Sequence, residues 1–295
     1  MGIPKRIKRY AGRYALVDGI PYEMPVSARN SPALMAGFTC DWEKANALLP
    51  GNEVHALQLP NGKATLLVTV INYVDTSIGK YIEYSIAIGC TRGPKPAPRI
   101  LNALLMKKYG TGQYILDLPV SSEISVKGGK GIWGMPKHKA NLDFKVTDNS
   151  VSSQYEKDGK FAFRIEMERP KSPSFRLKIG ATNYCRFRNM LMASYIYFNT
   201  KAGVNLFGKA KAKLFIGDHP NVAILRDIEI NPDPYFTLFM PAANGVLDDH
   251  FDCWFMTYDA PPKSMPEGLE SIIDLGLDET WLEPPSITNY EEFKI

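Results

Sequence analysis

The sequence has little that would place the chain in a membrane or on a nucleic acid. No apolar run reaches the ~20 residues of a membrane-spanning helix, and the basic N-terminus is not followed by the apolar stretch of a secretory signal. The formal net charge is only +4 and is spread without long basic blocks, so nothing indicates a nucleic-acid partner. We therefore expect a cytoplasmic protein that binds neither a membrane nor a nucleic acid.

Cysteine and histidine are also scarce, with four residues of each type. The cysteines lie far apart and form neither a metal motif nor a compact disulfide framework, at Cys40, Cys90, Cys185 and Cys253. Three of the histidines show no metal-ligand spacing, at His55, His219 and His250. We expect free thiols, no metal and no cofactor, as is typical of a reducing compartment.

What the sequence does contain is β-strand pattern. Residues 53–59, 64–73 and 81–90 are rich in branched and aromatic side chains, and turn-forming residues separate them. Asp158 and Gly159 lie between two further runs, 151–157 and 160–167. An Asp-Gly pair in that position predicts a tight β-hairpin.

Helical pattern is less frequent. Asp41 can cap a short helix over 42–49, and 99–108 and 221–228 are two further candidates, whereas 121–130 fits a short helix or a strand. Short strands with few crossover helices argue against a doubly wound parallel sheet. The pattern predicts a mostly-β α+β fold of antiparallel strands, closed as a barrel or packed as a sandwich, with a few peripheral helices. We expect a single domain over residues 1–295, with its core at about 20–255 and a surface tail over 260–295.

The glycine-rich run at 128–139 holds the most informative lysine, Lys137. The glycines at 129, 131 and 134 match a dinucleotide-binding string, but that motif requires a helix to begin at the glycines. Pro136 disfavours helical backbone at Met135, so this requirement fails. The glycines are better explained as letting the backbone fold tightly around the amine of Lys137.

Lys137 follows Trp133, Met135 and Pro136, and these apolar neighbours suggest a buried amine. Most lysines are solvated surface charges. Burial penalises the charged form of a lysine, and a neutral amine is a nucleophile that attacks carbonyl carbon. A buried lysine without a function would be unexpected, because holding it in apolar surroundings costs a large share of a typical domain's stability.

Residues 133–137, Trp-Gly-Met-Pro-Lys, resemble the motif of the acetoacetate decarboxylase superfamily. Residues 78–83 are similar to the family's Gly-x-Tyr-x-Glu segment, and 38–42 more weakly to its early strand-to-helix junction. The resemblance covers roughly residues 20–250 and implies a cone-like barrel. It also implies that Lys137 forms a Schiff base with a keto group and that Glu83 lines the active site, where it could move protons.

The sequence departs from this family at three places. His138 stands where several decarboxylases carry a second lysine, so burial would have to activate Lys137. Residues 66–72 contain no second acid, and Glu123 could replace it or could equally be a cap or surface residue. Arg29 lies roughly where the family binds the substrate carboxylate, with Arg186 and Arg188 as alternatives.

The sequence thus predicts a Schiff-base lyase that acts on a keto acid, most simply a β-keto acid decarboxylase. The expected catalytic residues are Lys137 and Glu83, and the expected substrate-binding residues are Arg29, Trp133, Met135, His138 and Glu123. Two alternatives stay open. One is a Schiff-base aldolase or dehydratase on a pyruvate-like acid, and the other is a non-catalytic pocket for an apolar carbonyl ligand. The resemblance also implies a homo-oligomer.

Overall fold

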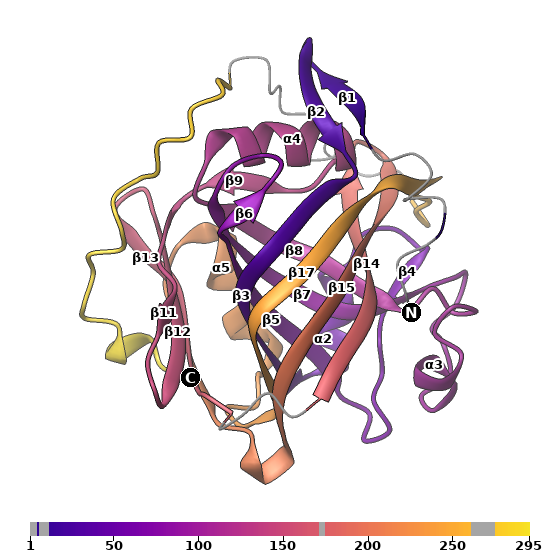
Figure 1. Cartoon of the computed structure of the whole chain (residues 1–295). Coiled ribbons are helices and arrows are strands. Elements are labelled where there is room, and N and C mark those ends of the chain that lie inside the picture. Colours follow the sequence, from indigo (N-terminus) through magenta and orange to yellow (C-terminus); the bar gives the residue numbers. More distant parts are fainter. Residues whose placement is uncertain (1–4, 6–11, 171–174, 261–274) are drawn as a thin grey trace.

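The computed structural model describes residue 5 and residues 12–170, 175–260 and 275–295. Strands dominate it, and seven of them close into a barrel (Figure 1). Their order is β7 (Tyr81–Arg92), β5 (Ala64–Tyr73), β3 (Val26–Cys40), β17 (Pro234–Phe255), β15 (Met190–Leu206), β14 (Phe175–Phe187) and β8 (Gly112–Val120). A β7–β8 pairing closes the ring. The mostly-β barrel predicted from the sequence is confirmed.

Not all of the barrel pairings are antiparallel. Strand β8 runs parallel to β14 at Gln113–Asn183, and further along it runs parallel to the short strand β9 (Lys137–Lys139) at Leu118–Lys137. One edge of β8 therefore has two successive neighbours, first β14 and then β9. Because β9 occupies this wall position, Lys137 is placed beside the barrel interior.

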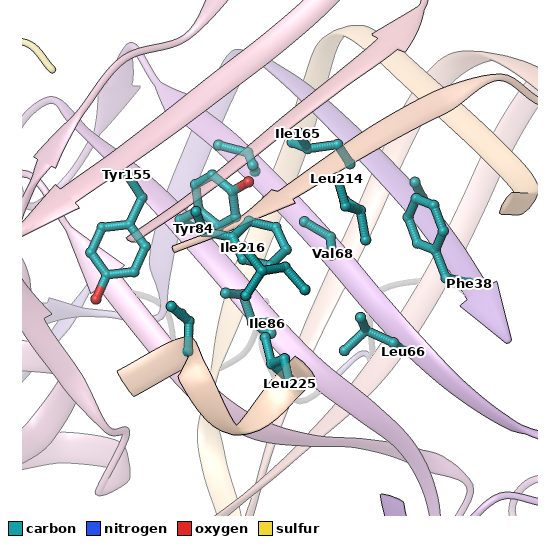
Figure 2. Close-up of a cluster of buried hydrophobic side chains, with 14 of the residues drawn as sticks. Phe38, Leu66, Val68, Tyr84, Ile86, Tyr155, Ile165, Leu214, Ile216 and Leu225 are labelled. Atoms are coloured by element: carbon teal, nitrogen blue, oxygen red, sulfur yellow. The ribbon is translucent and has the colours of Figure 1, made fainter. Parts of the chain in front are cut away.

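A smaller sheet packs against the outside of the barrel. It contains β10 (Asn141–Leu142), β11 (Lys145–Val146), β12 (Ser150–Lys157), β13 (Lys160–Glu168) and β16 (Ala212–Ile216). The predicted hairpin is present, with Asp158 and Gly159 both at positive φ between β12 and β13. Figure 2 shows how the barrel residues Val68, Tyr84 and Ile86 meet the outer-sheet residues Ile165 and Ile216 in a closed core.

The remaining strands are short. Strands β1 (Arg13–Val17) and β2 (Ile20–Met24) form a separate hairpin, while β4 (Val54–Ala56) and β6 (Asp75–Thr76) extend the barrel sheet at its edges. The strand predicted at 53–59 is thus limited to the three residues of β4. Those predicted at 64–73 and 81–90 correspond to β5 and β7.

The helices lie around the barrel, as Figure 1 shows. They are α2 (Trp42–Ala47), α3 (Leu101–Leu104), α4 (Glu123–Trp133), α5 (Pro220–Ala223), η1 (Phe207–Lys209), η2 (Ile224–Ile228) and η3 (Glu291–Phe293). Asp41 caps α2 as predicted, by accepting a hydrogen bond from the Lys44 backbone N–H. The helix predicted at 99–108 is confined to α3. None of the described helices combines the length and the apolar character needed to cross a membrane.

The final segment, 275–295, lies over the outer sheet and reaches the end of the barrel that carries α4 (Figure 1). The Leu275 carbonyl accepts a hydrogen bond from Lys127 of α4, and the backbone N–H groups of Ser286 and Ile287 donate to Glu156 of β12. Phe293 stacks on Phe161, with ring centroids 4.9 Å apart. The first part of the expected tail, 261–274, lies outside the described residues.

Candidate active site

The glycine-rich segment folds as a helix followed by a strand. Helix α4 runs through Gly128, Gly129 and Gly131 and ends at Gly134, whose φ of 63° gives the left-handed conformation that favours glycine at a helix C-terminus. The sequence pattern of residues 121–130 fits either a helix or a strand, and it suggests that the glycines allow a tight turn of the backbone around Lys137. The structure corrects this explanation, because only Gly134 acts as a turn residue.

Gly129 has a different function, which is to let α4 approach Lys137. A Cβ atom added at Gly129 would lie only 2.3 Å from Cδ of Lys137. The lysine side chain therefore passes over the helix at the place where α4 carries no side chain. Gly129 thus allows close contact with Lys137, but it does so by letting the side chain pack against the helix and not by forming a turn.

Lys137 is 3% exposed, and its Nζ atom has three polar or aromatic neighbours. Glu83 Oε2 lies 2.7 Å away, Ser125 Oγ accepts a hydrogen bond at 3.1 Å, and the centre of the Tyr81 ring lies at 5.2 Å. The first contact is a buried ion pair, which stabilises the charged amine against the cost of burial. The side chain is thus fixed, and its proton has an acceptor within hydrogen-bond distance.

Glu83 lies in the middle of β7, opposite Ile71 of β5 and Val120 of β8. Glu83 and Ser85 line the same cavity, as the alternation along a strand requires. Two stacked tyrosines, Tyr73 and Tyr81, lie near the carboxylate, with ring centroids 4.6 Å apart. Burial raises the pKa of both phenols well above the usual value, and the negative charge of Glu83 raises it further. Both tyrosines are therefore neutral at physiological pH.

The cavity beside Lys137 has a volume of ≈ 120 Å³ and walls that are mainly apolar. Trp133 and Met135, the two apolar residues expected to bind substrate, line it together with Lys137 and Glu83. The Trp133 ring is held by a hydrogen bond from its Nε1 to the Asp248 carbonyl, at 2.9 Å. The other walls come from every strand of the barrel, and include Met35, Ile71, Ile115, Ile196, Phe198, Leu238 and Met240.

His138 is not part of this cavity. It follows Lys137 on a strand, so its side chain points the opposite way, and its Nε2 atom lies 2.7 Å from Asp117 Oδ1 and 2.9 Å from Asn221 Nδ2. Tyr155 of the outer sheet completes this second polar cluster. The expectation that His138 contacts substrate is corrected by this geometry, which directs its side chain away from the cavity that Lys137 lines.

Glu123 and Arg29 are not brought to the cavity either. Glu123 lies in the first turn of α4, where its Oε1 atom is 3.5 Å from Nζ of Lys139. Arg29 is exposed on β3, in the stretch that pairs with β6. The alternatives Arg186 and Arg188 are likewise absent from the described residues that line the cavity. The expected substrate-binding set is thus reduced to Trp133 and Met135.

Comparison with known proteins places this arrangement in a family. The family model Acetoacetate decarboxylase (ADC) matches residues 10–188, which is more than half of the chain. The chain belongs to the acetoacetate decarboxylase family. A search of curated proteins found no match.

Solved structures with the family fold match across most of the chain. Acetoacetate decarboxylase from Legionella pneumophila subsp. pneumophila superposes with a TM-score of 0.57 at 14% identity, over 76% of this chain and 85% of that one. The enduracididine biosynthesis enzyme MppR with HEPES buffer bound gives 0.53 at 11%, over 78% and 88%. MppR complexed with the condensation product of pyruvate and imidazole 4-carboxaldehyde gives 0.50 at 11%, over 78% and 89%. At these identities the likeness shows the fold alone.

Ser125 is the residue beside the amine that the sequence did not reveal. It is fully buried on α4 and lies one helical turn before Gly129, on the same face of the helix. The spacing is visible in the sequence, because two small residues four positions apart lie on the same face of a helix and leave space there for another side chain. It was missed because 121–130 could not be assigned to a helix from sequence pattern.

Proposed function

We propose that this member of the acetoacetate decarboxylase family is an enzyme that forms a Schiff base between Lys137 and the carbonyl group of a small substrate. The observation that supports this most directly is the buried pair of Lys137 and Glu83, 2.7 Å apart at the edge of an apolar cavity. An adjacent group that can accept the proton is one of the ways in which a nucleophile is activated.

The first step is a proton transfer within this pair. Glu83 takes a proton from the Lys137 ammonium, and the neutral amine attacks the carbonyl carbon to give a carbinolamine. Glu83 then returns the proton to the departing hydroxyl group, so that water leaves and a charged iminium remains. The hydroxyl of Ser125, 3.1 Å from Nζ, holds the amine in place during these transfers.

The iminium acts as an electron sink for the next bond to break. If the substrate carries a carboxylate at the β position, carbon dioxide leaves and an enamine forms, which makes the enzyme a carboxy-lyase. If Glu83 instead removes a proton from the carbon next to the iminium, the same enamine can add to an aldehyde or lose water. The condensation product bound in MppR, which shares the fold, supports aldol or dehydration chemistry as the second candidate.

Reductive trapping tests the proposal. Cyanoborohydride reduces an iminium to a stable secondary amine, so incubation with acetoacetate or pyruvate should add to the peptide that contains Lys137 the mass of the reduced substrate or, where carbon dioxide leaves first, of the reduced decarboxylated product. Lys137→Met should abolish this adduct, whereas the control Lys139→Met on the same strand should retain it. An adduct on another lysine, or none across a broad panel of carbonyl compounds, would disprove the proposal.

Turnover separates an enzyme from a binding pocket. A catalytic chain should release carbon dioxide from a β-keto acid, or should convert a keto compound into an aldol or dehydration product. A chain that only forms the adduct and returns the carbonyl compound unchanged would be a binding protein.

A further inference from the structure

The charges that line the cavity restrict which carbonyl compounds can enter it. Among the described lining residues, Lys137 and Glu83 are the only side chains with a formal charge, and they compensate each other at 2.7 Å. The other polar side chains of the lining are neutral: Thr69, Ser85, Gln113, Asn183, Ser194 and Tyr195. They can hydrogen-bond a neutral oxygen, but they cannot neutralise an anion.

A substrate carboxylate would therefore be unpaired here. Before reaction the site contains one ammonium and one carboxylate, and after imine formation it contains one iminium and the same carboxylate of Glu83. A second carboxylate leaves a net negative charge in either state, inside walls that are mostly apolar, and burying an unpaired charge is strongly unfavourable. With a neutral carbonyl compound, the net charge of the site stays at zero before and after imine formation.

The arginines that could have supplied a cation lie elsewhere. Arg29 is exposed on β3, Arg188 is exposed in the turn after β14, and Arg186 lies on β14 but is not among the described residues that line the cavity. Lys139 shares a strand with Lys137, but its amine faces Glu123 at 3.5 Å and Asp278 at 3.9 Å. None of these side chains is among the described residues that line the cavity.

The volume of the cavity is a second restriction on the substrate. A protein cavity of ~150 Å³ lined by apolar side chains accommodates benzene, and the cavity beside Lys137 has a volume of ≈ 120 Å³. A substrate that fits without rearrangement is therefore no larger than about the size of benzene. The apolar walls, among them Ile71, Leu118 and Met240, favour a hydrocarbon body next to the reacting carbonyl.

From charge and size together, we infer that the substrate of this site is a small, neutral, apolar aldehyde, ketone or keto ester, and not a free keto acid. The inference rests on the proposed Schiff base and narrows its substrate class. It favours removal of an α-proton by Glu83 over loss of carbon dioxide: the α carbon–hydrogen bond breaks, the proton goes to the carboxylate, and the electron pair forms the enamine. Addition to a second neutral carbonyl, or loss of water from a β-hydroxyl group, would follow.

The test uses two probes that differ in charge and little else, acetoacetate and its methyl ester. Each is incubated with the full chain and cyanoborohydride near pH 7, and the rate of adduct formation at Lys137 is measured by peptide mass spectrometry. The same reaction with Nα-acetyl-lysine corrects for the different intrinsic reactivities of the two carbonyl groups. After correction, the ester should label Lys137 at least about tenfold faster, the ratio produced by ~1.4 kcal/mol of differential binding.

The outcomes separate this inference from the proposed function. Equal or faster labelling by acetoacetate would overturn the neutral-substrate assignment and leave the Schiff base intact. Labelling of Lys137 by neither probe would overturn the neutral-substrate assignment, whereas the proposed Schiff base is disproved only by failure across the broad panel of carbonyl compounds. Preferential labelling by the ester that disappears in Lys137→Met, with the variant still folded by circular dichroism, would support the assignment.

Discussion

The two faces of strand β7 have contrasting surroundings. The outward-facing residues Ile82, Tyr84 and Ile86 are packed in a closed core against the outer sheet. Figure 2 shows Tyr84 and Ile86 in this core. The inward-facing residues Glu83 and Ser85 border a cavity that contains a buried ion pair. One strand thus contributes to a closed core and to the candidate active site, and the difference arises from what is packed against each face.

The packed face derives its stability from a second layer that belongs to another part of the chain. Residues Tyr155, Phe163 and Ile165 of the outer sheet meet the barrel there, and all three are fully buried. On the other face, α4 covers the site with Ser125 and a glycine, and so leaves space next to Lys137. Small residues on α4 therefore leave space for the side chain of Lys137 beside the cavity.

The largest effect on the reactive face should come from Glu83→Gln. The amide keeps the shape of the side chain but cannot accept a proton, so turnover should fall by about 10²–10⁴. Reductive trapping at Lys137 should become slower without disappearing, because water can replace Glu83 in the proton transfers that form the imine. Ser85→Ala, on the same face of β7, is the control and should retain turnover within about tenfold. Unchanged turnover in Glu83→Gln would remove Glu83 from the mechanism.

Substitutions on the packed face should lower the free energy of unfolding. Phe163 is fully buried, with its ring centroid 5.8 Å from that of Tyr84, so Phe163→Ala should reduce the free energy of unfolding by about 3–5 kcal/mol. Phe198→Ala removes the same atoms from the wall of the cavity, where part of the ring already faces open space. Its cost should be less than half as large. Urea denaturation of both variants measures the difference, and equal costs would show that the cavity side is packed as firmly as the core.

Gly129→Ala should impair the site while leaving the helix intact. The new Cβ would lie 2.3 Å from Cδ of Lys137 and would displace the amine, whereas alanine favours a helix interior by up to ~1 kcal/mol over glycine. Trapping at Lys137 should therefore slow by about tenfold or more. Gly208→Ala is the control, because no atom lies within 4 Å of its added Cβ. Normal trapping in Gly129→Ala would mean that the lysine has an alternative path to the cavity.

The smallest expected effect is a difference in the rate at which a thiol reagent modifies one cysteine from each region. Burial raises the pKa of Cys40, in the packed core, and of Cys185, behind the cavity, to about 12. Because the raised pKa keeps both groups as unreactive thiols until the pH approaches that value, a thiol reagent at pH 8 should modify the exposed Cys253 first. In low urea, Cys185 should then react a few-fold faster than Cys40, since the region near a cavity opens at lower free energy. The reverse order would show that the packed face opens first.

Much of this comparison could be predicted from the sequence. The alternation through residues 81–88 predicts that Glu83 and Ser85 face away from Ile82 and Tyr84, and the structure has them so. The position of Lys137 after Trp133, Met135 and Pro136 predicts a buried amine, and Lys137 is 3% exposed. These features follow from patterns within a few residues, which a single strand or motif imposes by its own geometry.

The residues that sequence reasoning misplaced depend on longer-range packing. His138 was expected in the site, but β9 pairs with β8 and presents its opposite face to Asp117 and Asn221. Ser125 was not expected, because the helix that carries it could not be distinguished from a strand. Arg29 lies in the appropriate part of the sequence, but it is exposed.

Local sequence pattern is enough to predict most of the barrel strands, the hairpin at Asp158 and Gly159, and a buried lysine at position 137. Each of these is set by local backbone preference or by side-chain alternation. Only the tertiary structure decided that Lys137 pairs with Glu83, a contact that joins residues 54 positions apart through β9, β8 and β7. It also decided which charges reach the cavity, because barrel closure selects which side chains share an interior, and no local pattern encodes that selection.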